Sequence, residues 1–194
     1  TNFGSIVYTY SVDGIEYTAS VPTTAGTYYV KATVETTSNW NGTSETTTFT
    51  IAKQAVTLPT LTTSNTFVYT GNAITVGTTT NALYTIDGTT NTNVGNYQVT
   101  YTLKDTTNYV WANGNVETYT IAWSITKAQV VISGLEIDDW TYGQNANAPT
   151  ATTNFGSIVY TYSVDGINYT NVVPTNAGTY YVKATVETTS NWNG

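Results

Sequence analysis

Hydrophobic and polar residues alternate along two stretches of the chain, and this alternation predicts β-strands that bury one face. In residues 27–35 the positions on the first face are Tyr28, Val30, Ala32 and Val34. In residues 96–104 the corresponding positions are Tyr97, Val99, Tyr101 and Leu103. Successive side chains of a strand point to opposite faces, so these residues are expected to face a core. No segment follows a helical period over a useful length, so an all-β fold is expected.

Asp-Gly pairs interrupt this pattern at Asp13–Gly14, Asp87–Gly88 and Asp165–Gly166. Such pairs are typical of type I′ hairpin turns, in which both central residues have positive φ. With turn signals about every 8–12 residues, they predict small antiparallel β-sandwiches, which are expected to be arranged end to end. A β-grasp-like unit is the alternative, but it requires a helix that the pattern does not predict.

The strand pattern recurs because the sequence itself recurs. Residues 153–194 repeat residues 1–42 at an offset of 152 residues, and 38 of the 42 positions are identical. Self-similarity at a fixed period is the signature of a tandem array. The chain is therefore expected to hold slightly more than one period of such an array.

A weaker repeat inside this period divides the chain into units. Residues 94–109 resemble residues 25–40, with Gly, Tyr, Val and Asn at matching places. We therefore expect a fragment of unit A over 1–53 that lacks its first strands, a complete unit B over 54–127, and a second unit A over 128–194 that lacks its last strand. Unit B and a complete unit A together account for the period of 152 residues, which supports these boundaries.

The first unit A contains the last strand that is missing from the second unit A. Residues 43–53 are expected to fit the edge beside residues 178–188, with Phe49 and Ile51 pointing into the core. An open strand edge accepts a compatible strand. Either the chain is a window cut from a continuous array, which the few substitutions between the copies favour, or one chain's open unit is completed by the next chain.

Composition narrows the functional classes. Only 9% of residues are charged, the formal net charge is −7, and His, Cys and Met are absent. The lack of a cationic face argues against nucleic-acid binding, and the lack of Cys excludes disulfides and thiolate metal sites. No imidazole base exists for catalysis, and no apolar stretch reaches the roughly 18 residues that a membrane helix needs. We therefore expect no enzyme, no cofactor and no membrane span in this segment.

A resemblance to a known family is carried by the motif YSVDGxxYxxxxPTxAGTYYVKATVxxTxNWNGxxxxxxFTIAK. It resembles the tandem Ig-like repeats of large bacterial cell-surface proteins. The stretch WTYGQNANAP at 140–149 is similar to repeats of the MBG type, which carry a Tyr-Gly signature near their start. Unit B looks like a companion repeat of the same proteins. The resemblance implies an extracellular array that is attached to the cell wall through regions outside this segment, and it implies no reaction.

The densest carboxylates are Glu136, Asp138 and Asp139, and they form a weak candidate for a metal site. Calcium takes clustered oxygen ligands, so three acids close in sequence are compatible with it. They follow no fixed loop pattern, however, and a solvated turn is the favoured interpretation.

Four tryptophans, Trp40, Trp111, Trp140 and Trp192, are candidates for glycan binding or for contact between units. Aromatic rings on Asn-rich loops could stack on sugars. Trp is usually well buried, so packing within a core or against the neighbouring unit is the favoured interpretation.

The lysines bear on a further property of such repeats, which sometimes carry Lys–Asn isopeptide cross-links. That chemistry needs a buried Lys beside an acid. The alternation places Lys31, Lys104 and Lys183 on the outward face, and Lys53 and Lys127 fall at the expected unit junctions. No cross-link is therefore expected.

The favoured function is a structural segment of a long, repetitive extracellular surface fibre or adhesin stalk that acts as a spacer. Its partners would be neighbouring repeats of the same protein, joined head to tail. The alternative is a multivalent adhesin repeat that binds a glycan or a host surface, since weak sites gain by repetition. An exposed, contiguous aromatic patch would favour the alternative, whereas aromatic rings buried at unit junctions would favour the stalk.

Overall fold

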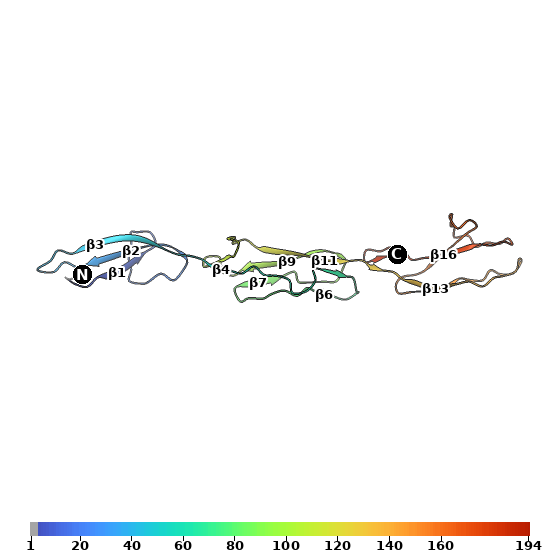
Figure 1. Ribbon diagram of the computed structural model, residues 1–194, viewed down its shortest axis with the longest axis horizontal. Helices are drawn as coiled ribbons and strands as arrows, with labels where there is room; N and C mark the ends of the chain where they lie inside the picture. Colours follow the sequence, from blue (N-terminus) through green and yellow to red (C-terminus); the bar gives the residue numbers. More distant parts are fainter. Residues whose placement is uncertain (1–3) are drawn as a thin grey trace. The chain divides into compact units, whose positions relative to one another are not determined.

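A computed structural model describes residues 4–194, and every regular element in that range is a β-strand (Figure 1). The prediction of an all-β chain is thus confirmed, and the helix that a β-grasp-like unit requires does not occur among these residues. Residues 1–3, which begin the first repeat copy, lie outside the described range. Within the same range, no helix has the length and apolar character that crossing a membrane requires.

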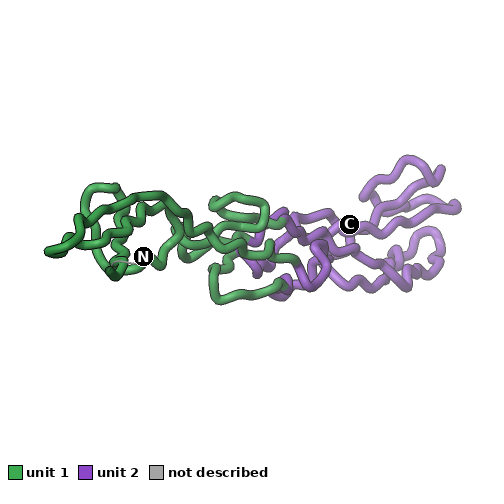
Figure 2. Tube along the Cα trace, turned by 60° about the vertical axis from the view of Figure 1, so that its left-hand side comes forward, with its two compact units in different colours: residues 1–60, 78–87, 100–121 green, residues 61–77, 88–99, 122–194 purple. Residues whose placement is uncertain are grey.

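The chain divides into two compact units, which Figure 2 colours separately. The first comprises residues 1–60, 78–87 and 100–121, and the second comprises residues 61–77, 88–99 and 122–194. The division passes through β9 (Gly95–Leu103) and β11 (Tyr119–Thr126). The compact units therefore differ from the repeat units, whose boundaries after residues 53 and 127 are defined by sequence and stay a prediction.

The first compact unit contains a three-stranded antiparallel sheet and parts of a larger one. Its complete strands are β1 (Val7–Ser11), β2 (Gly26–Val34), β3 (Thr43–Ile51), β4 (Gln54–Val56), β7 (Tyr84–Asp87) and β10 (Tyr109–Trp111). The three-stranded sheet has the order β1-β2-β3, and Val30 in its central strand lies opposite Tyr10 on one side and Thr47 on the other. Strand β4 pairs with β10, and β7 pairs with the last residues of β9.

An aromatic cluster forms the core of this unit. Tyr84, Tyr101 and Trp111 are all buried, and the Tyr84 ring lies 5.7 Å from the Tyr101 ring and 5.5 Å from the Trp111 ring, centroid to centroid. Val56 of β4 and Leu103 of β9 are buried as well, and so is Tyr28 of β2. Edge-to-face and tilted arrangements of this kind are the ones that aromatic pairs prefer, which suits a core rich in Tyr.

The second compact unit is built from short strands. Its complete strands are β5 (Thr66–Val68), β6 (Ile74–Thr75), β8 (Thr90–Asn91), β12 (Ala128–Gln129), β13 (Ile132–Glu136), β14 (Thr150–Thr153), β15 (Val159–Ser163), β16 (Tyr181–Thr185) and β17 (Trp192–Asn193). The antiparallel pairs are β6 with β8, β13 with β14, and β15 with β16. The pairing of β13 with β14 is interrupted between Ser133 and Glu136.

Trp123 organises the core of the second unit. Its ring lies 5.0 Å from that of Tyr97 and 6.1 Å from that of Phe67, and its Nε1 donates a hydrogen bond to the Gly88 carbonyl oxygen at 3.0 Å. The indole is thus buried with its one polar atom satisfied, as a buried Trp requires. Aliphatic residues that are also buried in this unit include Val76, Val99 and Ile125.

The predicted alternation is largely met in β9 and less so in β2. In β9 the expected core positions Val99, Tyr101 and Leu103 are buried and Tyr97 is half-buried, while the outward positions Gln98 and Thr102 are exposed and Thr100 is half-buried. In β2 only Tyr28 is buried, and the other expected core positions, Val30, Ala32 and Val34, are half-buried.

Some strand pairs among residues 4–194 are parallel, which departs from the antiparallel sandwiches that the sequence predicts. They are β4 with β10, β5 with β11, and β12 with β17. The two members of each pair are separated by more than fifty residues, so a hairpin does not connect them. Parallel neighbours need a long crossover, which here is the rest of the repeat unit.

The predicted type I′ turns are wrong. Gly14, Gly88 and Gly166 have positive φ, but no residue other than glycine does so among residues 4–194, so the preceding Asp residues do not. The Asp side chain organises the turn instead. In the first copy, Asp13 Oδ1 accepts hydrogen bonds from the backbone N–H groups of Ile15 and Glu16 at 2.8 and 3.2 Å. Such Asx turns let the side chain replace a backbone acceptor.

Candidate functional site

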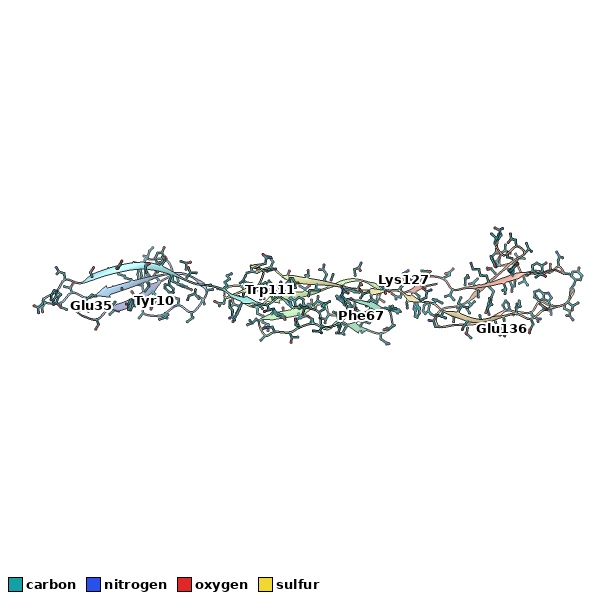
Figure 3. The ribbon with its side chains drawn as sticks, in the orientation of Figure 1. Tyr10, Glu35, Phe67, Trp111, Lys127 and Glu136 are labelled. Carbon is teal, nitrogen blue, oxygen red and sulfur yellow. The ribbon has the colours of Figure 1, made fainter. Side chains whose placement is uncertain are left out.

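Of the four candidate tryptophans, Trp111 belongs to a core. It is 1% exposed, and its ring lies 5.5 Å from Tyr84 and 6.2 Å from Tyr119. Its Nε1 donates to the Glu117 carbonyl oxygen at 2.8 Å, so its polar atom is satisfied inside the protein (Trp111 is labelled in Figure 3). A ring in this position has no free face for a sugar.

The other three tryptophans lie nearer the surface in different settings. Trp192 is half-buried, stacks on Phe155 at 4.5 Å and 9°, and meets the edge of Tyr69 at 6.0 Å. Trp140 is half-buried, whereas Trp40 is 52% exposed. Trp192 therefore joins the end of unit A to unit B of the predicted repeat, while only Trp40 among the four is more exposed than buried.

The three candidate metal ligands lie on an irregular loop and its adjoining strand. Glu136 ends β13, and Asp138 and Asp139 are exposed in the loop that follows. Asn147 Nδ2 donates to the main-chain oxygens of Asp138 and Asp139 at 3.3 and 3.0 Å, so the loop is tied through its backbone. Among residues 4–194, no group of three or more His, Cys, Asp or Glu side chains is placed to hold a metal ion.

The strand-completing residues Phe49 and Ile51 lie on β3 and are half-buried. The Phe49 ring lies 5.8 Å from that of Tyr28 and 6.1 Å from that of Tyr10. Phe49 therefore covers the same face of the β1-β2-β3 sheet that the alternation assigned to the core.

The most organised polar cluster surrounds the predicted boundary between residues 53 and 54, and we call it the first junction. Lys53 Nζ donates to the Thr106 carbonyl oxygen at 2.6 Å. The Gln54 backbone N–H donates to the Asn108 carbonyl oxygen at 2.8 Å, and Asn108 Oδ1 accepts from the Ala25 backbone N–H at 2.8 Å. Lys53 and Ala25 of the predicted unit A thus donate two hydrogen bonds to one loop of unit B, and the bond from Gln54 ties the start of unit B to the same loop.

The same bonds recur at the boundary between residues 127 and 128, the second junction. Lys127 Nζ donates to the Thr189 carbonyl oxygen at 2.7 Å (Lys127 is labelled in Figure 3). The Ala128 backbone N–H donates to the Asn191 carbonyl oxygen at 3.0 Å, and Asn191 Oδ1 accepts from the Val94 backbone N–H at 3.0 Å. In each junction a short parallel strand pair follows, β4 with β10 and β12 with β17.

No family model, curated protein or solved structure matches this chain. The two junctions therefore have to be interpreted from their own geometry. Each consists of a cationic donor, a backbone donor and an amide acceptor that connect one predicted unit to the next. Such a set holds two segments in a fixed register, and it contains neither a nucleophile nor a general base.

Sequence reasoning placed Lys53 and Lys127 at unit junctions but missed the acceptors that they bind. The available signal was the Asn that recurs at matching places in the inner repeat, at Asn39 and Asn108. A side chain that recurs in a loop, away from the alternating core pattern, is a candidate for a structural hydrogen bond. The loop carbonyls that accept from the lysines left no signal, because every residue has a carbonyl group.

Asp105 orients the Asn108 amide at the first junction. Its Oδ2 accepts from Asn108 Nδ2 at 2.8 Å, and its Oδ1 accepts from the backbone N–H groups of Thr107 and Asn108 at 2.9 and 3.1 Å. The bond from the Asn108 side chain is the largest of the effects that lower the pKa of Asp105 below its ordinary value. With its Nδ2 directed to Asp105, the Asn108 amide presents its oxygen to Ala25.

Replacing Asn108 by alanine is expected to lower the free energy of unfolding by about 1–2 kcal/mol, because the Ala25 N–H and the Asp105 carboxylate each lose a partner. The matched control is Asn39→Ala, at the same place in the first copy's loop, where the side chain makes none of the hydrogen bonds found among residues 4–194. That control is expected to stay within about 0.5 kcal/mol of the parent. Urea melts of the three proteins measure both values, and equal losses would contradict the junction role of Asn108.

Acid is expected to destabilise the chain below about pH 4. The pKa values of Asp13, Asp105 and Asp165 all lie below the ordinary value of an aspartate. For Asp13 and Asp165 the largest cause is a hydrogen bond from a backbone N–H group, that of Ile15 and that of Asn168 respectively. For Asp105 the largest cause is the hydrogen bond from the Asn108 side chain. Near and below pH 4 the unfolded chain binds more protons than the folded one, so stability falls as the pH falls toward the folded pKa values. Urea melts at pH 5 and pH 3 test this, and Asp165→Asn is expected to narrow the difference between them. If the stability of that variant differed between pH 5 and pH 3 as much as that of the parent, Asp165 would not contribute to the acid sensitivity.

Proposed function

We propose that this chain is a structural segment of a long, repetitive extracellular surface fibre or adhesin stalk, in which tandem Ig-like sandwiches act as a spacer. The observation that carries the proposal is the recurrence of one set of hydrogen bonds at two successive predicted junctions. The lysine that donates to a loop carbonyl oxygen is Lys53 at the first junction and Lys127 at the second. The Asn whose side-chain oxygen accepts a backbone N–H is Asn108 at the first junction and Asn191 at the second. A protein that only needed several independent copies of a domain would not need its linkers to be built alike.

The physical consequence of such junctions is resistance to bending. A flexible linker leaves neighbouring domains free to reorient, whereas here rotation would have to break the two hydrogen bonds that cross each junction, one from the lysine and one to the Asn side-chain oxygen. Trp192, held between Phe155 and Tyr69, adds an apolar contact at the second junction. In repeat proteins, stability is approximately the sum of unit and interface terms, so a recurring interface stabilises every repeat that it joins.

Several features support an extracellular location. The motifs resemble repeats of bacterial cell-surface proteins, and a chain without Cys or Met resists thiol and thioether oxidation. Only five residues are Lys or Arg, which leaves few sites for trypsin-like proteases. The partners in this proposal are neighbouring repeats of the same protein.

Glycan binding is the weaker proposal. Trp111 is enclosed in a core, Trp192 is covered on one face by Phe155, and only Trp40 of the four candidates is mostly exposed. A single exposed ring is a small binding surface for a sugar. The placement of the aromatic residues therefore supports the spacer over the adhesin repeat.

Solution scattering on the chain, and on the chain extended by one further period of 152 residues, tests the spacer proposal. A strand rises about 3.3 Å per residue, so a sandwich with strands of about eight to ten residues is roughly 30 Å long, and two sandwiches together with their loops should lengthen the particle by on the order of 70–80 Å. The maximum dimension is expected to increase by that amount. An increase of less than about half of it would show that the repeats fold back on one another, which a spacer cannot do.

A further inference from the structure

The loop between β1 and β2, together with its counterpart between β15 and β16, is where the two copies of unit A differ. It comprises residues 12–25 in the first copy and residues 164–177 in the second, and we call these stretches the first and the second loop. All four substitutions between the copies fall in it, namely Glu16/Asn168, Ala19/Asn171, Ser20/Val172 and Thr24/Asn176. Residues 35–41 are exposed too, yet they are identical to residues 187–193, so exposure alone does not account for where the differences lie.

The frame of the loop is the same in both copies despite the substitutions. Ser11 Oγ donates to Asp13 Oδ1 at 2.8 Å and accepts from the Gly14 backbone N–H at 2.9 Å, and the counterpart bonds in the second copy measure 2.7 and 2.9 Å. Two backbone hydrogen bonds join Tyr10 to Thr18, and the second copy repeats them. A loop that is already ordered loses little conformational entropy when it binds, so this frame favours an interaction.

Two aliphatic side chains lie exposed at the tip of this frame, on either side of the Asp-Gly pair. Val12 and Ile15 are 74% and 80% exposed. Their counterparts in the second loop, Val164 and Ile167, are 73% and 80% exposed. Strand β3 is present in the first copy, and β13 and β14 are present in the second, so neither end of a unit A covers the tip. The exposed apolar tip is therefore a property of the loop itself.

The substituted positions beside the tip give the two loops complementary polar groups. Glu16 adds an exposed carboxylate to the first loop. The second loop has an exposed amide at that place, Asn168, and two further exposed amides at Asn171 and Asn176. Two first loops brought together would place one Glu16 beside another, and like charges repel. A first loop that faces a second loop instead places the carboxylate beside amide donors.

Size and spacing indicate a partner that carries the same repeat. One loop is much smaller than the surface of about 800 Å² that each partner buries in a stable interface. The loop recurs at an offset of 152 residues, so an array with the same period can engage successive loops at once. Several weak contacts made together bind far more tightly than one contact alone.

We propose that the first loop binds the second loop of another molecule of this chain. Val12 and Ile15 pack against Val164 and Ile167 of the other molecule, and Glu16 faces its amide-bearing loop positions. This lateral contact goes beyond the spacer role. Its gain from repetition rests on the long array proposed above, whereas the contact between two loops does not.

Disulfide trapping tests which loops meet, because the chain has no Cys of its own. A chain with Ile15→Cys is mixed with an isotope-labelled chain with Ile167→Cys, and mass spectrometry identifies the linked pairs. The mixed pair is expected to exceed its statistical share over the Ile15→Cys homodimer at least about fivefold at low salt, and the excess is expected to fall in about 1 M salt. Adding Asn168→Glu to the second chain is expected to reduce the mixed pair at least about threefold, because Glu then faces Glu.

Sedimentation equilibrium gives a second measurement, in which Ile15→Ser is expected to weaken self-association of the chain at least about tenfold. Val131→Ser is the matched control, since Val131 is 57% exposed and lies outside both loops. It is expected to leave self-association unchanged. Both side chains are largely exposed, so the urea midpoints of the two variants should equal that of the parent.

Three results would overturn the proposal. A statistical mixture of disulfides would show that the loops do not select each other. Equal weakening by Ile15→Ser and Val131→Ser would show that the tip is not the contact. A chain that stays monomeric up to about 1 mM would show that the loops do not bind. None of these results bears on the spacer, whose length is measured by scattering on dilute chains.

Discussion

Replacing Trp111 by alanine is expected to lower the free energy of unfolding by about 3–5 kcal/mol, the range for removing a large aromatic side chain from a core. The indole is 1% exposed and lies against Tyr84 and Tyr119, so its removal leaves a cavity that these rings cannot fill. The Glu117 carbonyl oxygen also loses the hydrogen bond from Nε1. Equilibrium unfolding in urea, followed by circular dichroism, measures the loss.

Trp40→Ala provides the comparison, because it deletes the same side chain at a position that is 52% exposed. We expect it to cost less than about 1 kcal/mol. If both tryptophans were exposed glycan-binding residues, the two variants would not be expected to differ in their free energy of unfolding. Similar losses for the two variants would contradict the assignment of Trp111 to the core.

The strand content could be predicted because a strand with one well-covered face shows it in its sequence. In β9, Val99, Tyr101 and Leu103 alternate with exposed polar residues, and the structure buries the three as expected. The same pattern in β2 left Val30 half-buried. Alternation reports which face is apolar, whereas the depth of burial depends on whether another layer covers that face.

The parallel pairs could not be predicted from local pattern. Strand β5 pairs with β11 through Thr66 and Ser124, which are 58 residues apart. Nothing in either segment encodes the direction of a distant partner, whereas a hairpin is encoded by the turn between its strands. The hydrogen bonds of the two junctions could not be predicted from the sequence for the same reason. Asn108 accepts from Ala25 across 83 residues of sequence, and only the folded chain brings the two together.

Gly88→Ala is expected to lower the free energy of unfolding by about 2–5 kcal/mol. Gly88 has a φ of +77°, a conformation that costs an L-residue about 1–2 kcal/mol. A Cβ atom there would also lie 2.2 Å from the Gln98 carbonyl oxygen, a backbone atom that cannot rotate away. Relieving that overlap would shift the backbone at Gly88. The Gly88 carbonyl oxygen accepts a hydrogen bond from Trp123 Nε1, so the shift would also disturb the core of the second compact unit.

Gly71→Ala separates the two causes. Gly71 has a similar φ of +83°, but a Cβ atom there would have no neighbour within 4 Å, so only the conformational cost of about 1–2 kcal/mol is expected. The difference between the variants in urea melts then measures the overlap with Gln98. The Asp-Gly pair at 87–88 suggested a turn that needs positive φ at both residues, whereas the structure assigns the requirement to the glycine and adds a close backbone approach. Equal losses in the two variants would show that this approach does not constrain residue 88.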